Sequence, residues 1–175
     1  MAVIEIVKYP EQVLLKQSEP VAQIDGLLQK RIDEMFEALY AARGLGLAAP
    51  QVGDSRAFFV YDLSLLEEAP SNQKGPVVVM NPELVKMEGE EIAEEGCLSI
   101  PGYYEKVKRA YRVQLKGLDR EGKEIRIEGE GLFARMLQHE VDHINGVLMI
   151  DRFSILKKDI FFRKFKKQMK QGGKR

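Results

Sequence analysis

Two histidines four residues apart, His139 and His143, are the residues of this sequence best suited to chemistry. On an α-helix, residues at this spacing lie one turn apart on the same face, so both imidazoles can reach a single metal ion. Glu140 lies on the flank of that face. Such a pair can also occur in an ordinary amphipathic helix. Because the chain has no other histidine, and unpaired imidazoles are costly to bury, we favour a metal site.

A catalytic metal site usually has three protein ligands and one position left for water. With no third histidine, the candidate is the only cysteine, Cys97, which lies in the run Glu95-Gly96-Cys97-Leu98-Ser99. An isolated cysteine is most often a small buried apolar residue. Beside an incomplete two-histidine site, we instead predict that the Cys97 thiolate completes the set.

Two strong helices are predicted around these residues. The histidines belong to a helix over about 131–144, which ends near Gly146. An earlier helix over 24–42 has apolar residues at helical spacing, with Asp25 as its N-cap and Gly44 as its stop. The segment 44–53 contains three glycines and a proline, and is predicted as a shaped loop rather than a helix or strand.

Short strands are predicted between the two helices. Their β-branched and aromatic residues place them at 57–61, 77–80, 104–108, 113–116 and 125–128, with a bend at Asn81-Pro82 and an exposed loop at 71–76. A last helix is predicted from Phe153 to about Met169. The order predicts an α+β fold, with antiparallel sheets packed around a central metal-binding helix, an N-terminal helix and a C-terminal basic helix.

Composition narrows the class of protein. The length of 175 residues fits one domain, and 45% hydrophobic with 31% charged residues argues against a disordered chain. The balance of 27 basic and 27 acidic residues disfavours a uniformly basic nucleic-acid binder. One cysteine allows no intrachain disulfide, and neither a signal peptide nor a membrane span is visible. We expect a cytoplasmic enzyme or binding protein.

The charge balance conceals a basic C-terminal segment. Residues 152–175 contain ten Lys or Arg and one acidic residue, so this tail carries a net +9 and residues 1–151 a net −9. The same segment has an apolar stripe of Ile155, Leu156, Ile160, Phe161, Phe162, Phe165 and Met169. Such a helix can contact RNA, an anionic membrane or a protein groove, or can simply dock on its own domain. We therefore divide the chain into a catalytic domain, 1–151, and a basic helix and tail, 152–175.

Three separated blocks of the sequence resemble the signature motifs of the peptide deformylase family, in the family's order and at similar spacing. They are Gly44-Leu45-Gly46-Leu47-Ala48-Ala49-Pro50-Gln51, Glu95-Gly96-Cys97-Leu98-Ser99 and Gln138-His139-Glu140-Val141-Asp142-His143. The resemblance covers nearly the whole chain. It implies a metal-dependent hydrolase that removes the N-formyl group from the initiator methionine of new polypeptides and releases formate.

The resemblance also implies a role for each metal ligand and for the general base. Cys97, His139 and His143 would hold one divalent ion, usually Fe2+ in this family, with Zn2+, Ni2+ or Co2+ able to substitute. The residues alone would favour zinc at least as well as iron, because thiolate and imidazole both suit zinc. Glu140 would remove a proton from the attacking water and return it to the departing amine.

Further roles follow from the same resemblance. The side-chain amide of Gln51 and the backbone N–H of Leu98 would stabilise the oxyanion, while Gly44 and Gly46 would let the backbone pair with the substrate. Three apolar residues are candidates for the methionine pocket, although ordinary core packing explains them equally well: Leu45, Leu132 and Met136. Three charged residues are candidates for supporting the metal ligands: Glu95, Arg109 and Asp142.

Two alternatives differ from this hypothesis. A zinc endopeptidase could use the same two-histidine helix, but the usual third His or Glu ligand is missing. A binding module could instead act through the basic tail. In some deformylases a C-terminal helix touches the ribosome near the nascent-chain exit, so the resemblance also allows the tail to tether a catalytic domain to its N-formylmethionyl substrates.

Overall fold

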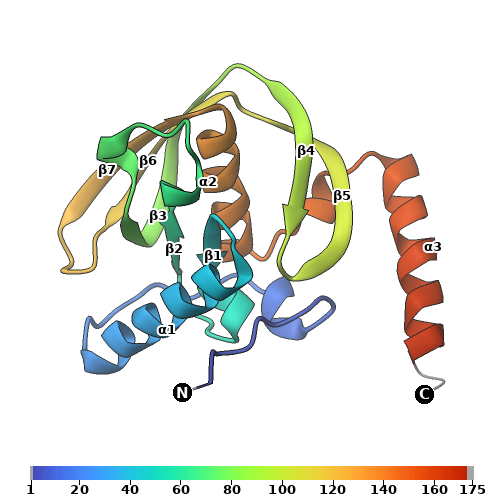
Figure 1. Ribbon diagram of the computed structural model, residues 1–175, viewed down its shortest axis with the longest axis horizontal. Coiled ribbons are helices and arrows are strands. Elements are labelled where there is room, and N and C mark those ends of the chain that lie inside the picture. The colour runs from blue at the N-terminus through green and yellow to red at the C-terminus, as the bar shows by residue number, and fades with distance from the viewer. Residues whose placement is uncertain (1, 173–175) are drawn as a thin grey trace.

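A computed structural model describes residues 2–172. Met1 and residues 173–175, including the last two basic residues predicted for the tail, lie outside the described part. Figure 1 shows helix α2 (Gly131–Ile144) in the middle, between a five-stranded sheet and a two-stranded hairpin. Helix α1 (Gly26–Ala42) crosses one side of the sheet, and α3 (Ile155–Gly172) stands at the outer edge. The α+β fold with a central helix is confirmed.

The two sheets are antiparallel throughout. The larger has the order β1 (Gly46–Ala48), β2 (Phe58–Asp62), β3 (Pro76–Glu88), β6 (Arg112–Leu118) and β7 (Glu124–Glu130). The smaller pairs β4 (Glu91–Cys97) with β5 (Ile100–Arg109). Strand β1 is therefore an edge strand, and Cys97 ends β4 beside the hairpin turn.

The five predicted strands all exist, but most extend further than predicted. Asn81-Pro82 does not end β3; it forms a bulge, after which the strand continues to Glu88. Asn81 has a left-handed backbone with φ 50°, and its side chain accepts from the N–H of Val21 at 2.8 Å and donates to the Val21 carbonyl. The side chain of Asn81 thus pairs with the backbone N–H and C=O of Val21 at the point where the hydrogen-bond ladder between β3 and β6 is interrupted.

The prediction for segment 44–53 was wrong. It forms strand β1 and a 3-10 helix over Ala49–Val52, because β1 pairs with β2 from Gly46 to Ala48. A second strand, β4, was not predicted. Helix α1 begins as predicted, with the Asp25 side chain accepting from the N–H of Leu28 at 2.9 Å, but Arg43 rather than Gly44 is the left-handed residue that ends it.

Helix α2 is buried along nearly its whole length. Every residue from Phe133 to Ile144 is buried. Strand β2 explains how the layers stack, because alternate side chains point to opposite faces of a strand. Phe58 and Val60 pack with α1 in one core cluster, whereas Phe59 and Tyr61 pack with α2 in another. Polar residues on α2 consequently lie in the interior.

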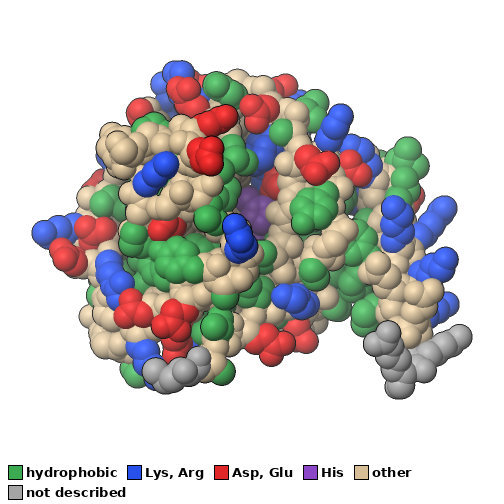
Figure 2. Space-filling view, viewed as in Figure 1, with side chains coloured by type: hydrophobic (Ala, Val, Ile, Leu, Met, Phe, Trp, Pro, Cys, Tyr) green, Lys and Arg blue, Asp and Glu red, His purple; other side chains and the backbone are tan. Residues whose placement is uncertain are grey.

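Helix α3 docks through a small part of its predicted apolar stripe. Phe161 is buried and Phe165 half-buried, and both pack against Tyr9, while Phe161 also meets Tyr103. The other five stripe residues are exposed: Ile155, Leu156, Ile160, Phe162 and Met169. Figure 2 shows basic side chains along the outer side of this helix. No described helix has the length and apolar character needed to cross a membrane.

Gly146 provides a test of how α2 ends. It has φ +73°, and an added Cβ would lie 2.8–3.0 Å from backbone atoms of Leu15 and Lys16. We expect Gly146→Ala to lower the free energy of unfolding by about 2 kcal/mol or more, since the strained backbone cannot move away.

Gly26→Ala is the matched control, because a Cβ there meets nothing within 4 Å. This variant should change stability by less than about 1 kcal/mol. Urea unfolding of both variants measures the difference; equal stabilities would contradict the packing described for Gly146.

Candidate active site

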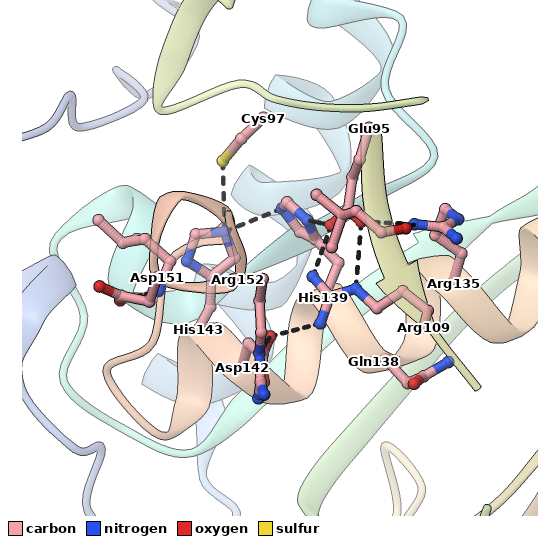
Figure 3. Close-up of polar contacts among 12 residues, drawn as sticks. Glu95, Cys97, Arg109, Arg135, Gln138, His139, Asp142, His143, Asp151 and Arg152 are labelled. Atoms are coloured by element: carbon pink, nitrogen blue, oxygen red, sulfur yellow. Dashed lines mark hydrogen bonds and ion pairs between the residues drawn. The ribbon is translucent and has the colours of Figure 1, made fainter. Parts of the chain in front are cut away.

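The thiol of Cys97 and the imidazoles of His139 and His143 converge on one point. Nε2 of His139 and Nε2 of His143 are 3.2 Å apart, and Sγ of Cys97 lies 3.4 Å from Nε2 of His143. Possible ligand atoms of the three residues all lie within 4.8 Å of one another. Figure 3 shows the thiol approaching from the hairpin and the two rings from α2. The structure thus brings together the three residues predicted as metal ligands.

The spacing of these atoms fits a divalent ion. Tetrahedral ligands at about 2.0–2.1 Å for nitrogen and 2.3 Å for sulfur are separated by about 3.3 Å (N to N) and 3.6 Å (S to N). The observed separations of 3.2 and 3.4 Å are close to these values. Burial and the neighbouring His139 hold the pKa of His143 well below its usual value, so its imidazole is neutral and able to coordinate.

A buried carboxylate orients the first histidine. Because a carboxylate only accepts, Nδ1 of His139 donates to Glu95, which leaves Nε2 free to face the ligand cluster. Glu95 also accepts from Arg109 at 2.6 and 3.1 Å and from Arg135 at 3.0 Å. Burial alone would raise the pKa of Glu95, but the hydrogen bonds from His139 and Arg109 outweigh it and hold the pKa far below the usual value.

The network extends from Arg109 to the far side of α2. Nη1 of Arg109 donates to Asp142 at 2.5 Å, and Arg152 donates to the same carboxylate at 2.8 and 3.1 Å. The three predicted supporting residues, Glu95, Arg109 and Asp142, are therefore in direct contact through Arg109. Arg135 and Arg152 were not predicted. Arg135 lies four residues before His139 on the buried face of α2, and that position is the signal that could have found it.

Glu140 lies close to β1. Its side chain is buried, and its Oε2 has no hydrogen-bond partner among the described residues. Burial raises the pKa of Glu140 to about 7. A Cβ on Gly46 would lie 3.0 Å from Oε1 of Glu140 and 3.0 Å from Sδ of Met136, so a larger residue there would require these two side chains to shift. A carboxyl group with a free oxygen and a pKa near 7 is suited to accepting and returning a proton.

Gln51 is held in one orientation by both ends of its amide. Oε1 accepts from the N–H of Ala48 at 2.9 Å, while Nε2 donates to Oγ of Ser99 at 3.1 Å and lies 3.7 Å from Sγ of Cys97. The amide N–H groups therefore point toward the ligand cluster. Ser99, which is fully buried, was not predicted to support Gln51. The sequence shows only that Ser99 is small and follows Cys97 by two residues, which does not indicate this role.

A cleft of about 580 Å³ leads to this cluster, and Figure 2 shows histidine at the base of a hollow. The predicted substrate-binding residues all line it: Gly44, Leu45, Gly46, Leu132 and Met136. Leu132 is 49% exposed, which favours a place at the cleft mouth over core packing. Met136 is buried and belongs to the core cluster as well. Gln51 and Leu98 also line the cleft, whereas Arg109 and Asp142 line a separate cavity.

The sequence model of the family described as polypeptide deformylase matches residues 3–159. The chain belongs to this family. Peptide deformylase from Thermodesulfovibrio yellowstonii is 52% identical over 166 residues, which cover 95% of this chain and 98% of that relative. Members of the family are metal-dependent hydrolases, and the comparisons give the zinc endopeptidase alternative no support.

Solved structures lead to the same family. A peptide deformylase from Legionella pneumophila superposes with a TM-score of 0.87 at 43% identity, over 99% of both chains. A peptide deformylase from Ehrlichia chaffeensis, solved in complex with actinonin, superposes with a TM-score of 0.86 at 38% identity, over 96% of this chain and 98% of that one. The fold of the whole described chain is therefore the family's fold.

Arg109→Ala tests whether the buried network supports the metal ligands. Removing this cation leaves Glu95 and Asp142 as buried carboxylates with fewer partners, so we expect stability to fall by about 3–5 kcal/mol. Loosening Glu95 should also weaken metal affinity about 10- to 100-fold. Arg126→Ala, at an exposed ion pair on β7, is the control and should change neither quantity.

Metal affinity is measured by competition with a chelator, under conditions where both variants remain folded. Unchanged metal content and an unchanged rate of formate release in Arg109→Ala would show that the network does not support the site.

Proposed function

We propose that this chain hydrolyses the N-formyl group of the initiator methionine of nascent polypeptides and releases formate. Membership of the peptide deformylase family supports this activity. The observation that carries the proposal for the site is the convergence of one thiol and two imidazoles at the base of a cleft, with Glu140 and Gln51 beside them.

We assign Cys97, His139 and His143 as ligands of one divalent ion, and propose Fe2+ on the family resemblance. A thiolate with two imidazoles also suits Zn2+, and Ni2+ or Co2+ can take the same donors. When bound, such an ion supplies an acidified water as the nucleophile near neutral pH.

The remaining chemistry is assigned to residues around the cluster. Glu140 takes a proton from the attacking water and passes it to the amine of methionine as that group departs. The formyl oxygen, which becomes negatively charged, accepts hydrogen bonds from Nε2 of Gln51 and from the backbone N–H of Leu98. Because Ala48 and Ser99 already fix the amide of Gln51, this donor is oriented before the substrate arrives.

Other residues of the cleft are suited to binding the methionine side chain and the backbone of the substrate. Leu45, Leu132 and Met136 offer apolar surface to the methionine side chain. Strand β1 pairs with β2 on one side only, so its other edge is open to an added strand. Gly46 begins β1 and Gly44 lies just before it, and both line the cleft. We therefore propose that the substrate backbone pairs with β1.

Formate release from a formyl-Met peptide tests the reaction directly. Glu140→Gln should keep the metal but lower kcat about 10²- to 10⁴-fold, because the proton acceptor is removed. Glu37→Gln, at an exposed position on α1, is the control and should leave kcat unchanged. The same peptide carrying an acetyl group should be cut poorly. Full activity in Glu140→Gln would rule out its role as the base.

The basic helix is proposed as a ribosome-binding element attached to the catalytic domain. On α3, basic residues of the outer surface, including Lys166, Lys167 and Lys170, are exposed. Phe153 and Phe161 lie in the same core cluster as Leu148, so the division of the chain at 151/152 remains a proposal about function. We also propose a cytoplasmic location of bacterial type, because the chain resembles bacterial members of the family.

Charge reversal on α3 tests this role more sharply than deletion, which would uncover the surface beneath Phe161. Lys166→Glu, Lys167→Glu and Lys170→Glu combined should weaken ribosome binding at least tenfold at low salt, because phosphate contacts dominate such affinity. Activity on a short formyl peptide should survive. The control reverses three exposed lysines elsewhere: Lys16, Lys74 and Lys106. Co-sedimentation with ribosomes measures binding, and equal binding by all forms would contradict the proposal.

A further inference from the structure

The N-terminal segment, residues 7–9, joins the two elements that supply the proposed oxyanion donors. The N–H of Val7 donates to the carbonyl of Gln51 at 2.7 Å, and the N–H of Tyr9 donates to the carbonyl of Ser99 at 2.9 Å. Gln51 belongs to the 3-10 helix after β1, whereas Ser99 lies in the turn between β4 and β5. Because two residues span at most about 7 Å, these bonds limit how far the two elements can separate.

Lys8 adds a side-chain contact between these two backbone bonds. Its Nζ donates to the carbonyl of Leu98 at 3.3 Å, and Lys8 lines the active-site cleft. Figure 1 shows the N-terminal segment, in dark blue, passing below the turn of the β4–β5 hairpin. Leu98 is the residue whose backbone N–H is assigned to the oxyanion above. No step of the reaction assigned above uses Lys8.

The contact with Lys8 affects how the N–H of Leu98 is aimed. Leu98 lies in a turn, outside the bounds of β4 and β5, so the ladder of the hairpin does not fix its backbone. On one side, the preceding Cys97 is held at the ligand cluster through its thiol. On the other side, Lys8 holds the carbonyl of Leu98. The backbone that carries the donor is therefore restrained from both ends.

The aim of this donor matters most when charge develops on the formyl oxygen. An N–H group stabilises an oxyanion only if it already points to the position that the charged oxygen will occupy. The neutral formyl group of the bound substrate gains less from the same N–H. Loss of aim should therefore lower kcat and leave KM nearly unchanged, because it removes an interaction made mainly in the transition state.

We propose that Lys8 is a positioning residue for deformylation. By holding the Leu98 carbonyl, Lys8 keeps the N–H of Leu98 directed at the formyl oxygen, while the backbone of residues 7–9 keeps this donor in place beside Gln51. This inference rests on the proposed function. It gives the N-terminal segment a part in catalysis that acts through Leu98, without contact to the reacting atoms.

Lys8→Met tests the proposal, since methionine keeps an unbranched apolar stem but cannot donate a hydrogen bond. With formyl-Met-Ala-Ser as substrate, kcat for formate release should fall about fivefold or more, and KM should stay within about twofold. Lys8→Arg should recover most of kcat, because a guanidinium group can donate to the same carbonyl. A kcat in Lys8→Met equal to that of the unaltered protein would overturn the inference.

Lys16→Met is the matched control. Lys16 is also exposed and carries the same charge, but it does not line the active-site cleft, so kcat should not change. Salt separates the hydrogen bond of Lys8 from its charge: if about 0.5 M salt lowers kcat of the unaltered protein to that of Lys8→Met, the charge is responsible and the positioning role is wrong. An unaltered protein that releases no formate would instead contradict the proposed function itself.

Discussion

The buried carboxylate of Glu95 is the interaction on which the rest of the site depends. It joins β4 to α2 through His139, to β5 through Arg109, and to a second position on α2 through Arg135. A lone buried carboxylate would be strongly unfavourable, whereas this one is stabilised by several charged donors. Because Cys97 follows two residues later on β4, fixing Glu95 against α2 also brings the thiol to the histidines.

The groups proposed for catalysis come from three different elements around Glu95. Helix α2 supplies Glu140, the 3-10 helix after β1 supplies Gln51, and the hairpin turn supplies the backbone of Leu98. Close approach of β1 to α2 depends on Gly46, since any larger residue would meet the side chain of Glu140. The absence of a side chain at Gly46 thus lets β1 lie close to the residues of α2 that line the cleft.

The sequence was most informative where a single element determines the structure. The histidine helix and the Asp25 cap are local, so periodicity and capping rules found them. Strand β1 was missed because its pairing with β2 overrides the glycines and proline around it. Strand β4 was missed because Glu95, near its end, is buried only through its contacts with Arg109 of β5 and Arg135 of α2, which are distant in the sequence. The partial docking of α3 depends on Tyr9 and Tyr103, which are distant in the sequence.

The central claim is that one thiolate and two imidazoles, brought together by the contacts of Glu95, bind a single divalent ion. X-ray absorption at the K-edge of the metal, on protein purified without oxygen, tests it most directly. The account predicts one ion per chain, with one sulfur at about 2.3 Å and two imidazole nitrogens near 2.1 Å. A coordination shell without sulfur, or a folded protein that binds no stoichiometric metal, would contradict it.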